Sequence, residues 1–355
     1  MRTKSPIVKL EDQTPDLFGG AGADTDLDVS YMSKSLCLSG LPLRRQFVRD
    51  PVTRKTLEPQ REITSFSRTD DRFALHISAD SFQLPDKDGK RSVPFQMGLP
   101  YGARARLLIL WMTTQARLCG SRWLTIGRIT DWLEEAGITP HPDAAEAAKE
   151  QLLRLAFCRF KMMLADQGRQ QTVFHSNQLI SSAIFQSEDL ENYAAGEIAK
   201  VRFPAGIELS EESFKTFTGS NVIPVSTSQL RQISNNAMSI DLFLYFNYKL
   251  PLITPGSTEL FAWKALIRQF GNGETPKRFR YVFEDSIKHS LKAYTGADVE
   301  ICDEGLLMRY SPPAEIRKPL VAVSRLKLVD GGDGPAKVRT RNRIAPPLTQ
   351  PELDL

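Results

Sequence analysis

The residues best suited to binding chemistry lie on one predicted helix, residues 275–294. Placed at about 100° per residue, its large apolar side chains fall on one side and most of its cations on the other. The apolar side holds Phe279, Val282, Phe283, Ile287 and Leu291. The opposite side holds Lys277, Arg278, Tyr281, Lys288 and Lys292, interrupted by Glu284 and Asp285, with Arg280 on the flank. Since arginine can pair twice with guanine and lysine can pair with phosphate, this side predicts a surface for duplex DNA; the alternative is a solvated charged face.

The elements around this helix support the DNA interpretation. A short amphipathic helix over residues 263–270 precedes it, and the turn between them contains Gly271 and Gly273. A predicted hairpin follows, with strands over residues 298–302 and 306–310. An apolar helix and a short strand come earlier, over residues 239–250 and 257–261. This order is that of a winged helix-turn-helix, whose second helix enters the major groove with its N-terminal residues nearest the bases.

The first half of the chain repeats this order without sequence identity. The predicted elements are a helix over residues 104–118, a strand over 122–126, a helix over 129–136, a helix that Pro142 opens, and a hairpin that begins with the strand 159–164. The candidate DNA-binding residues are Lys149 and Arg154 on the second helix and Arg159, Lys161 and Arg169 along the hairpin. Because Asp143 and Glu146 at the start of that helix would repel phosphate, we expect it to be the weaker base reader, in contact with the DNA backbone or a protein.

The predicted fold class is therefore α+β, with tandem winged helix-turn-helix domains between disordered tails. Residues 1–28 hold six acids and three bases and few apolar anchors, which is typical of a disordered segment. The predicted divisions are a disordered acidic tail (1–40), a linker or arm (41–70), a first winged-helix module (71–215), a second module (216–312) and a basic mobile tail (313–355).

Catalytic and cofactor chemistry is not visible in the sequence. The four histidines and four cysteines are scattered, with no pair at metal-ligand spacing. The segment most similar to a phosphate-binding loop is residues 271–277. Its glycine and lysine spacing is wrong for such a loop, and it has a proline where a backbone N–H donor is needed. We therefore expect no enzyme, no cofactor and no metal, although acidic metal sites assembled in three dimensions stay open.

Composition agrees with a cytoplasmic globular protein. The 355 residues are 41% hydrophobic and 25% charged, with a net charge of +4, which suits one large domain or two of medium size. The longest apolar run, Leu107–Met112, is far shorter than the roughly 18 residues of a membrane span, and no secretory leader is visible.

Three blocks of the sequence resemble plasmid replication initiator proteins of the RepA type. They are Arg45–Asp50, the Gly-Leu-Pro-Tyr-Gly block from Gly98 to Arg106, and the block from Trp263 to Phe279; the similarity spans about residues 45–313. The resemblance implies a non-catalytic protein on plasmid DNA. Such proteins bind repeated duplex sites (iterons) at the origin, help to open the adjacent DNA and recruit host proteins such as the helicase, initiator or sliding clamp. The positions matched are Lys277, Arg278, Arg280 and Tyr281, and the Tyr101–Arg106 block, to which the sequence assigns no role.

A short peptide in the acidic tail is similar to the motifs that dock on the replicative sliding clamp. It comprises Gln13, Asp16, Leu17 and Phe18, with one residue too many between Gln13 and Asp16. Leu17 and Phe18 are the adjacent large apolar pair that a clamp pocket would accept. The alternative is an incidental dipeptide.

Other functions stay open at this level. A dimeric transcriptional repressor without initiator activity would use the same DNA-binding surface, and the active form, monomer or homodimer, is not determined by the sequence. A protein-interaction scaffold would bind no DNA, and a nuclease would nick supercoiled plasmid in the presence of divalent metal.

Overall fold

The computed structural model describes residues 28–53, 55–69, 73–85, 92–166, 171–271 and 275–313, all within one unit, residues 1–319. The predicted clamp peptide, Arg169 and the predicted C-terminal tail beyond residue 313 lie outside these ranges.

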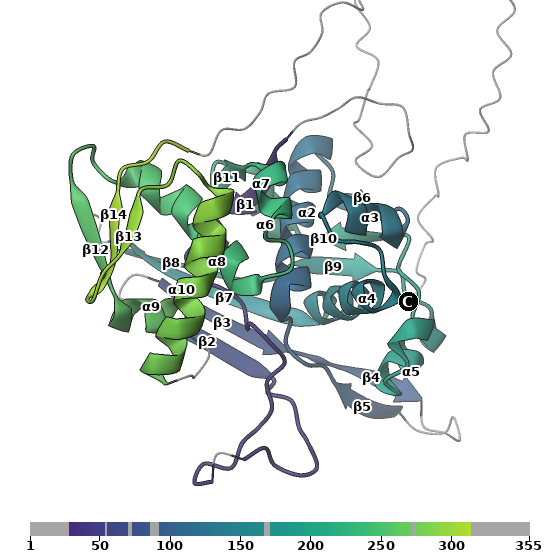
Figure 1. Ribbon diagram of the computed structural model, residues 1–355. Coiled ribbons are helices and arrows are strands. Elements are labelled where there is room, and N and C mark those ends of the chain that lie inside the picture. The colour runs from purple at the N-terminus through teal and green to yellow at the C-terminus, as the bar shows by residue number, and fades with distance from the viewer. Residues whose placement is uncertain are drawn as a thin grey trace, which may run out of the picture. The chain divides into compact units, whose positions relative to one another are not determined.

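Helices and strands alternate along the chain (Figure 1). The helices are α1 (Lys34–Cys37), α2 (Gly102–Cys119), α3 (Ile129–Glu135), α4 (Pro142–Ala156), α5 (Ser187–Ala194), α6 (Glu211–Thr218), α7 (Thr227–Arg231), α8 (Ala237–Lys249), α9 (Trp263–Phe270) and α10 (Pro276–Ala293), with short 3-10 helices at Ile198–Lys200 and Leu250–Leu252. The strands are β1 (Ser30–Ser33), β2 (Ser65–Thr69), β3 (Phe73–Ala79), β4 (Ser81–Pro85), β5 (Ser92–Gln96), β6 (Trp123–Thr125), β7 (Cys158–Asp166), β8 (Gln171–Gln178), β9 (Ile180–Ala183), β10 (Gly206–Leu209), β11 (Val222–Val225), β12 (Thr258–Ala262), β13 (Val299–Ile301) and β14 (Gly305–Arg309).

The second half follows the predicted element order closely. Helix α8 is followed by β12, α9, α10 and the hairpin β13–β14, and the strands pair antiparallel in the order β12-β14-β13. Helix α8 begins where the Asn236 side chain accepts a hydrogen bond from the Ser239 N–H, 3.0 Å away. It is buried nearly all round, because α2 packs against it on one side and α10 on another.

The first half departs from the prediction in its strand pairing. The hairpin β7–β8 forms as predicted, but it joins a four-stranded antiparallel sheet in the order β2-β3-β7-β8. The strand β6 pairs instead with β10, which pairs with β9. The hairpin that the sequence assigned to the first module as a wing therefore belongs to another sheet. Its partner β3 lies 79 to 91 residues earlier in the chain, so the local pattern could not indicate the pairing.

The four-stranded sheet has one buried and one exposed face. Phe160 lies between Ile77 and Asn177 in the register, and both Phe160 and Ile77 are fully buried. Lys161 lies between His76 and Ser176 on the other face and is exposed. The alternation predicted for residues 159–164 is therefore confirmed, since successive strand residues point to opposite faces.

The two predicted modules share one hydrophobic core. A continuous cluster of buried side chains runs from Leu75 and Phe160 through Leu108 on α2 to Phe243 on α8 and Phe283 on α10. A buried ion pair also joins α2 to α8, since Arg106 Nη2 lies 2.6 Å from Asp241 Oδ2. A smaller cluster under β4, β5 and α5 centres on Phe82, Met97, Leu153, Tyr193 and Val201.

The predicted boundaries need correction where the structure describes them. Residues 30–37, assigned to a disordered tail, form β1 and α1; β1 pairs with β11, and Met32 and Cys37 are buried in the core. The prediction of a tail was based on the acidic composition of residues 1–28 and was extended over this short segment. The partner strand β11 lies about 190 residues later, so the local pattern did not indicate the pairing. The boundary predicted at residue 70 divides the β2–β3 hairpin, and that at residue 215 falls inside α6.

Candidate nucleic-acid interface

Helix α10 is held against the core by aromatic packing. Pro276 occupies its first turn, where the missing N–H costs no hydrogen bond. The Phe279 and Phe283 rings stack with centroids 4.7 Å apart, and the Trp263 and Phe270 rings of α9 lie 5.9 and 6.0 Å from Phe283. With Ile287 also fully buried, these contacts fix which side of the helix faces solvent.

The solvent side of α10 carries the predicted cations. Lys277, Arg278, Lys288 and Lys292 are exposed, and none of them forms an ion pair within the described part of the chain. Tyr281 is 81% exposed. We call these five residues the α10 face. Their predicted exposure is confirmed; one apolar residue was placed wrongly, because Val282 is 46% exposed and not in the core.

Arg280 differs from its neighbours because it forms ion pairs within the protein. Its Nε lies 2.7 Å from Glu284 Oε1, its Nη2 lies 3.6 Å from Asp303, and its guanidinium lies over the Trp263 ring. The hydrogen bond to Glu284 is the main cause that raises the pKa of Arg280. This side chain ties α10 to the β13–β14 turn, so its charge is already balanced within the protein.

The turn of the β13–β14 hairpin is unsuited to phosphate. Asp303 and Glu304 are both exposed there. The cation on β14, Arg309, pairs with Asp298 at 2.9 Å and with Glu300 at 3.1 Å. Among the described residues of this module, four cations on α10 and Lys264 on α9 are exposed and form no ion pair with a described residue.

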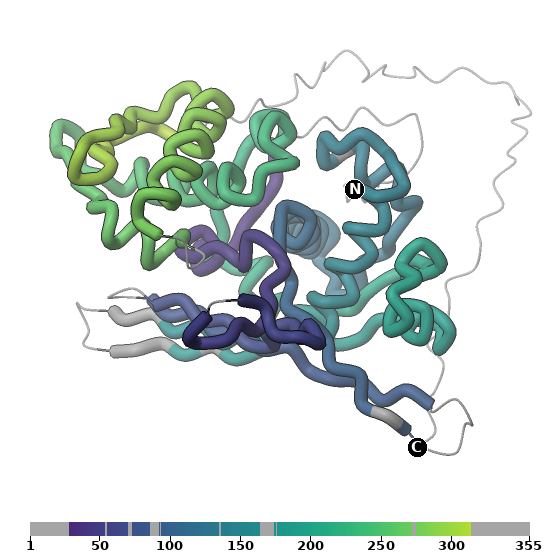
Figure 2. The backbone as a smooth tube through the Cα atoms, turned by 60° about the horizontal axis from the view of Figure 1, so that its bottom comes forward, coloured from purple at the N-terminus to yellow at the C-terminus, as the bar shows by residue number. Residues whose placement is uncertain are grey.

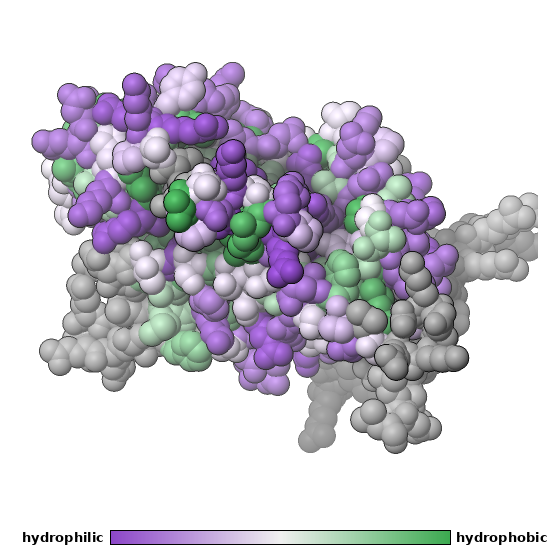
Figure 3. All heavy atoms as spheres, turned by 90° about the horizontal axis from the view of Figure 1, so that it is seen from below, coloured by the Kyte–Doolittle hydropathy of each residue, from purple (hydrophilic) through white to green (hydrophobic). Residues whose placement is uncertain are grey.

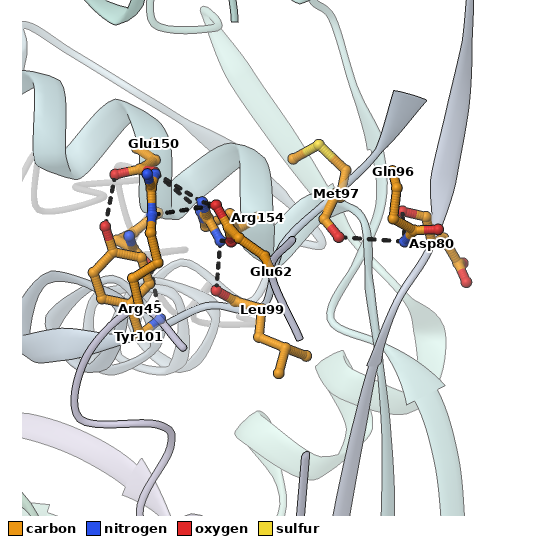
Figure 4. Close-up of polar contacts among 10 residues, drawn as sticks. Arg45, Glu62, Asp80, Gln96, Met97, Leu99, Tyr101, Glu150 and Arg154 are labelled. Atoms are coloured by element: carbon orange, nitrogen blue, oxygen red, sulfur yellow. Dashed lines mark hydrogen bonds and ion pairs between the residues drawn. The ribbon is translucent and has the colours of Figure 1, made fainter. Parts of the chain in front are cut away.

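The second helix of the first module is not open to solvent as predicted. Arg154 on α4 is 2% exposed and donates two hydrogen bonds to the Glu62 carboxylate, at 2.6 and 2.9 Å, and others to Glu150 and the Leu99 carbonyl (Figure 4). Burial alone would lower the pKa of Arg154, but the hydrogen bonds to Glu62 raise it instead. Because its guanidinium is buried in these contacts, Arg154 has a structural role and is not accessible to DNA in this structure. Its partner Glu62 lies 92 residues away in the chain, so the local sequence pattern could not indicate the pair.

Lys149 is also placed against protein. It is half-buried, and its ammonium group donates to the Ala199 carbonyl at 3.3 Å, in the 3-10 helix that covers this side of α4. The adjacent Glu150 and Gln151 on α4 are buried.

The two described candidate cations on the β7–β8 hairpin, Arg159 and Lys161, are both exposed. Arg159 is exposed but its Nε pairs with Asp80 Oδ2 at 2.8 Å. Lys161 is exposed on the outer face of the four-stranded sheet, which is a different sheet from β12-β14-β13. The described candidate cations of the first module therefore lie on α4 and on the four-stranded sheet, and those of the second module lie on α10.

The Tyr101–Arg106 block, which the sequence could not explain, has a structural role. The Tyr101 hydroxyl donates to Glu150 at 3.0 Å, and its backbone N–H donates to Gln151. Burial, followed by the Glu150 charge, raises the pKa of Tyr101, so the phenol stays protonated as a donor. Arg104 donates to the Ser234 carbonyl and Asn235, and Arg106 to Asp241. The block joins the arm, α4 and α8.

Metal and thiol chemistry each need a particular arrangement of side chains. Within the described ranges, no three histidine, cysteine, aspartate or glutamate side chains come together as a metal site would need. Burial raises the pKa of the Cys158 thiol to about 12, which disfavours the reactive thiolate. None of the described helices has both the length and the hydropathy to cross a membrane.

The geometry defines an α+β protein whose second half exposes the cationic side of a helix, while aromatic side chains pack against the other side of that helix. Residues 99–265 match the family described as plasmid encoded RepA protein. This match confirms that the chain resembles plasmid replication initiators of the RepA type. No curated protein matches the sequence significantly.

Two solved structures are similar to the chain. One is the crystal structure of selenomethionine derivatives of domains 2 and 3 of RctB, with 12% identity and a TM-score of 0.42; it matches over 75% of this chain and 88% of that chain. The other is a crystal structure of RctB domains 2–3, with 11% identity and a TM-score of 0.41, over 78% of this chain and 94% of that chain.

Proposed function

We propose that this protein is a plasmid replication initiator that binds repeated duplex DNA sites at the plasmid origin, promotes opening of the adjacent DNA and recruits host replication proteins such as the helicase, initiator or sliding clamp. The observation that carries the DNA-binding part is the α10 face, whose cations are exposed and free of ion pairs within the described residues. The match of residues 99–265 to the RepA family supports the initiator role. The proposed role needs no catalytic group.

Helix α10 is proposed to enter the major groove as the recognition helix of a winged helix-turn-helix. Arg278 and Lys277 lie in its first turn, where a recognition helix contacts base edges. Lys288 follows Arg278 by ten residues, or about 15 Å of helix axis, slightly more than the roughly 12 Å width of the groove. Arg278 then meets bases while Lys288 and Lys292 meet the flanking backbone. The acidic β13–β14 turn is proposed to stay off the phosphates.

The Arg278→Ala variant tests this placement. We expect binding to a 40-bp duplex, selected by the wild-type chain from a random-sequence library, to weaken by about 5- to 150-fold, or about 1–3 kcal/mol. Because the lost contact is to a base, binding to a scrambled 40-bp duplex should change far less. Fluorescence anisotropy at fixed salt measures both affinities.

The Lys288→Ala variant is the matched control, since it removes one exposed cation from the same helix. We expect equal losses on both duplexes and a salt slope that is smaller by about 0.9, as for one phosphate contact. If neither variant changes binding, or if the wild-type chain does not distinguish the two duplexes, α10 is not the reading helix.

A plasmid maintenance assay separates an initiator from a repressor. A plasmid without an origin, carrying this gene and its flanking DNA, is expected to replicate in a permissive host, and the Arg278→Ala version is expected to be lost. A dimeric repressor without initiator activity would silence a reporter fused to its own promoter but would not maintain the plasmid. That result would reject the initiator role and leave DNA binding intact.

A further inference from the structure

The chain between α1 and β2 builds a projecting hairpin that the sequence analysis left as a linker. We call residues 46–53 and 55–63 the arm hairpin. Backbone hydrogen bonds close it: the Val48 N–H donates to the Arg61 carbonyl, the Ile63 N–H to Gln46, and the Asp50 N–H to Lys55, at 2.8, 3.0 and 2.8 Å. In Figure 1 it is the dark purple loop below the four-stranded sheet, and in Figure 2 it crosses in front of that sheet.

The base of the arm hairpin is fixed by charge. Glu62 accepts both hydrogen bonds from Arg154, and Arg45 pairs with Glu62 at 3.2 Å and also with Glu150. Arg45 and Arg154 both lie near the Tyr101 ring. Arginine forks of this kind hold a loop in one geometry, so little entropy remains to be lost when the arm hairpin binds a ligand.

The outer part of the arm hairpin is cationic and largely exposed. Arg49, Lys55 and Arg61 are exposed, and none of them forms an ion pair within the described residues. Residues 48–61 contain four bases and two acids. One of those acids, Asp50, accepts hydrogen bonds from the Thr53 and Val52 N–H groups, which lower its pKa and shape the tip. Val52 at the tip is 87% exposed.

The strand that follows the arm hairpin contacts the helix that precedes α10. The arm hairpin leads directly into β2, whose Arg68 donates to the Gln269 carbonyl of α9, the helix before α10. Five strand residues span about 17 Å, about half of one turn of B-DNA. In Figure 1 the arm hairpin and the N-terminal end of α10 both point to the lower side, which Figure 3 shows to be largely hydrophilic with scattered apolar side chains.

We propose that the arm hairpin is a second duplex-DNA contact, which binds the phosphate backbone beside the segment that α10 reads, through Arg49, Lys55 and Arg61. This inference rests on the proposed function, because α10 must place the duplex. It assigns the second contact to the arm hairpin and not to α4, which the sequence predicted to contact the DNA backbone or a protein and whose Arg154 is buried. An acidic protein surface is the competing ligand, and the experiment distinguishes the two.

The test is the double variant Arg49→Ala/Lys55→Ala in the full chain. Neither residue belongs to the Arg45–Glu62–Arg154 anchor, so unfolding should match the wild type. With the selected 40-bp duplex, we expect the slope of log affinity against log salt to fall in magnitude by about 1.8, as for two phosphate contacts. The fold loss should be equal on the scrambled duplex, and hydroxyl-radical protection should disappear at one flank only.

Arg128→Ala/Lys215→Ala is the control, since it removes two exposed cations that pair with Asp131 and Glu211. It should keep the wild-type slope. An arm variant with the wild-type slope and footprint overturns the proposal and leaves the protein surface as the arm's ligand. If Arg278→Ala still weakens binding to the selected duplex in that case, the proposed function stands. If the wild-type chain binds neither duplex, the proposed function itself fails.

Discussion

Replacing Arg106 by alanine is expected to lower the free energy of unfolding by about 3–5 kcal/mol, the cost of removing one partner of a buried ion pair. All five N–H groups of this guanidinium are used. Two bind the Asp241 carboxylate at 2.6 Å each, and the others bind the carbonyls of Leu41, Pro42 and Gly102 at 2.7, 3.2 and 2.8 Å. With Arg106 2% and Asp241 6% exposed, water cannot replace the lost donors.

The large effect follows from what is left behind. Without Arg106, the Asp241 carboxylate on α8 stays buried with no cation, and three carbonyls lose a donor. Little repacking is available, since a Cβ at the neighbouring Gly40 would already come within 2.1 Å of Asp241 Oδ2. Because Arg106 is on α2 and Asp241 on α8, the loss falls on the contact between the two halves of the chain.

Urea unfolding of matched variants measures this loss. Arg104→Ala, two residues away, removes hydrogen bonds to Ser234 and Asn235 that are partly solvated, and it should cost only about 1 kcal/mol. Arg106→Met/Asp241→Leu removes both charges and should recover at least half of the loss of the single variant. An Arg106→Ala protein within 1 kcal/mol of the wild type would show that the pair does not hold the halves together.

Local patterns in the sequence were enough to predict the elements of the second half. The period of Phe279, Phe283 and Ile287 fixes which side of α10 is buried, and that in turn exposes Lys277 and Arg278. This works because a helix surface repeats every few residues, so one segment contains all the information about its own two sides. The predicted burial of Val282 was wrong because this residue lies at the edge of the apolar arc, where the neighbouring element determines whether a side chain is exposed.

Partners that are distant in the chain could not be predicted in the same way. The i,i+4 spacing of Glu150 and Arg154 suggests a surface pair on α4, but Glu62 from the arm completes the network and buries it. Arg104 and Arg106 look alike in the sequence, and only the position of Asp241 decides which of the two is buried. The arm hairpin was missed for the same reason; six bases within residues 44–61 were the available indication.

Replacing Arg154 by methionine is the second substitution expected to cost about 3–5 kcal/mol. The methionine can fill the space against Tyr101, but Glu62 and Glu150 then face each other with Arg45 as their one remaining cation in the network shown in Figure 4. The control is Arg159→Met, five residues along the chain. Its pair with Asp80 is as short, 2.8 Å, but the side chain is 58% exposed, so we expect a loss of 0–1 kcal/mol.

The Arg154→Met variant should also release the arm hairpin, because Glu62 loses both hydrogen bonds that anchor its base. Trypsin cuts after Arg49, Lys55 and Arg61, which are exposed but held in a hydrogen-bonded hairpin in the folded chain. At a temperature where the variant is still folded, cleavage at these three sites should be faster than in the wild type and in Arg159→Met, with other sites unchanged. Since local opening and global unfolding expose different sites, this pattern separates loss of the anchor from general instability. Equal stability losses in the two arginine variants, with equal cleavage of the arm, would mean that burial at Arg154 contributes nothing beyond a surface ion pair.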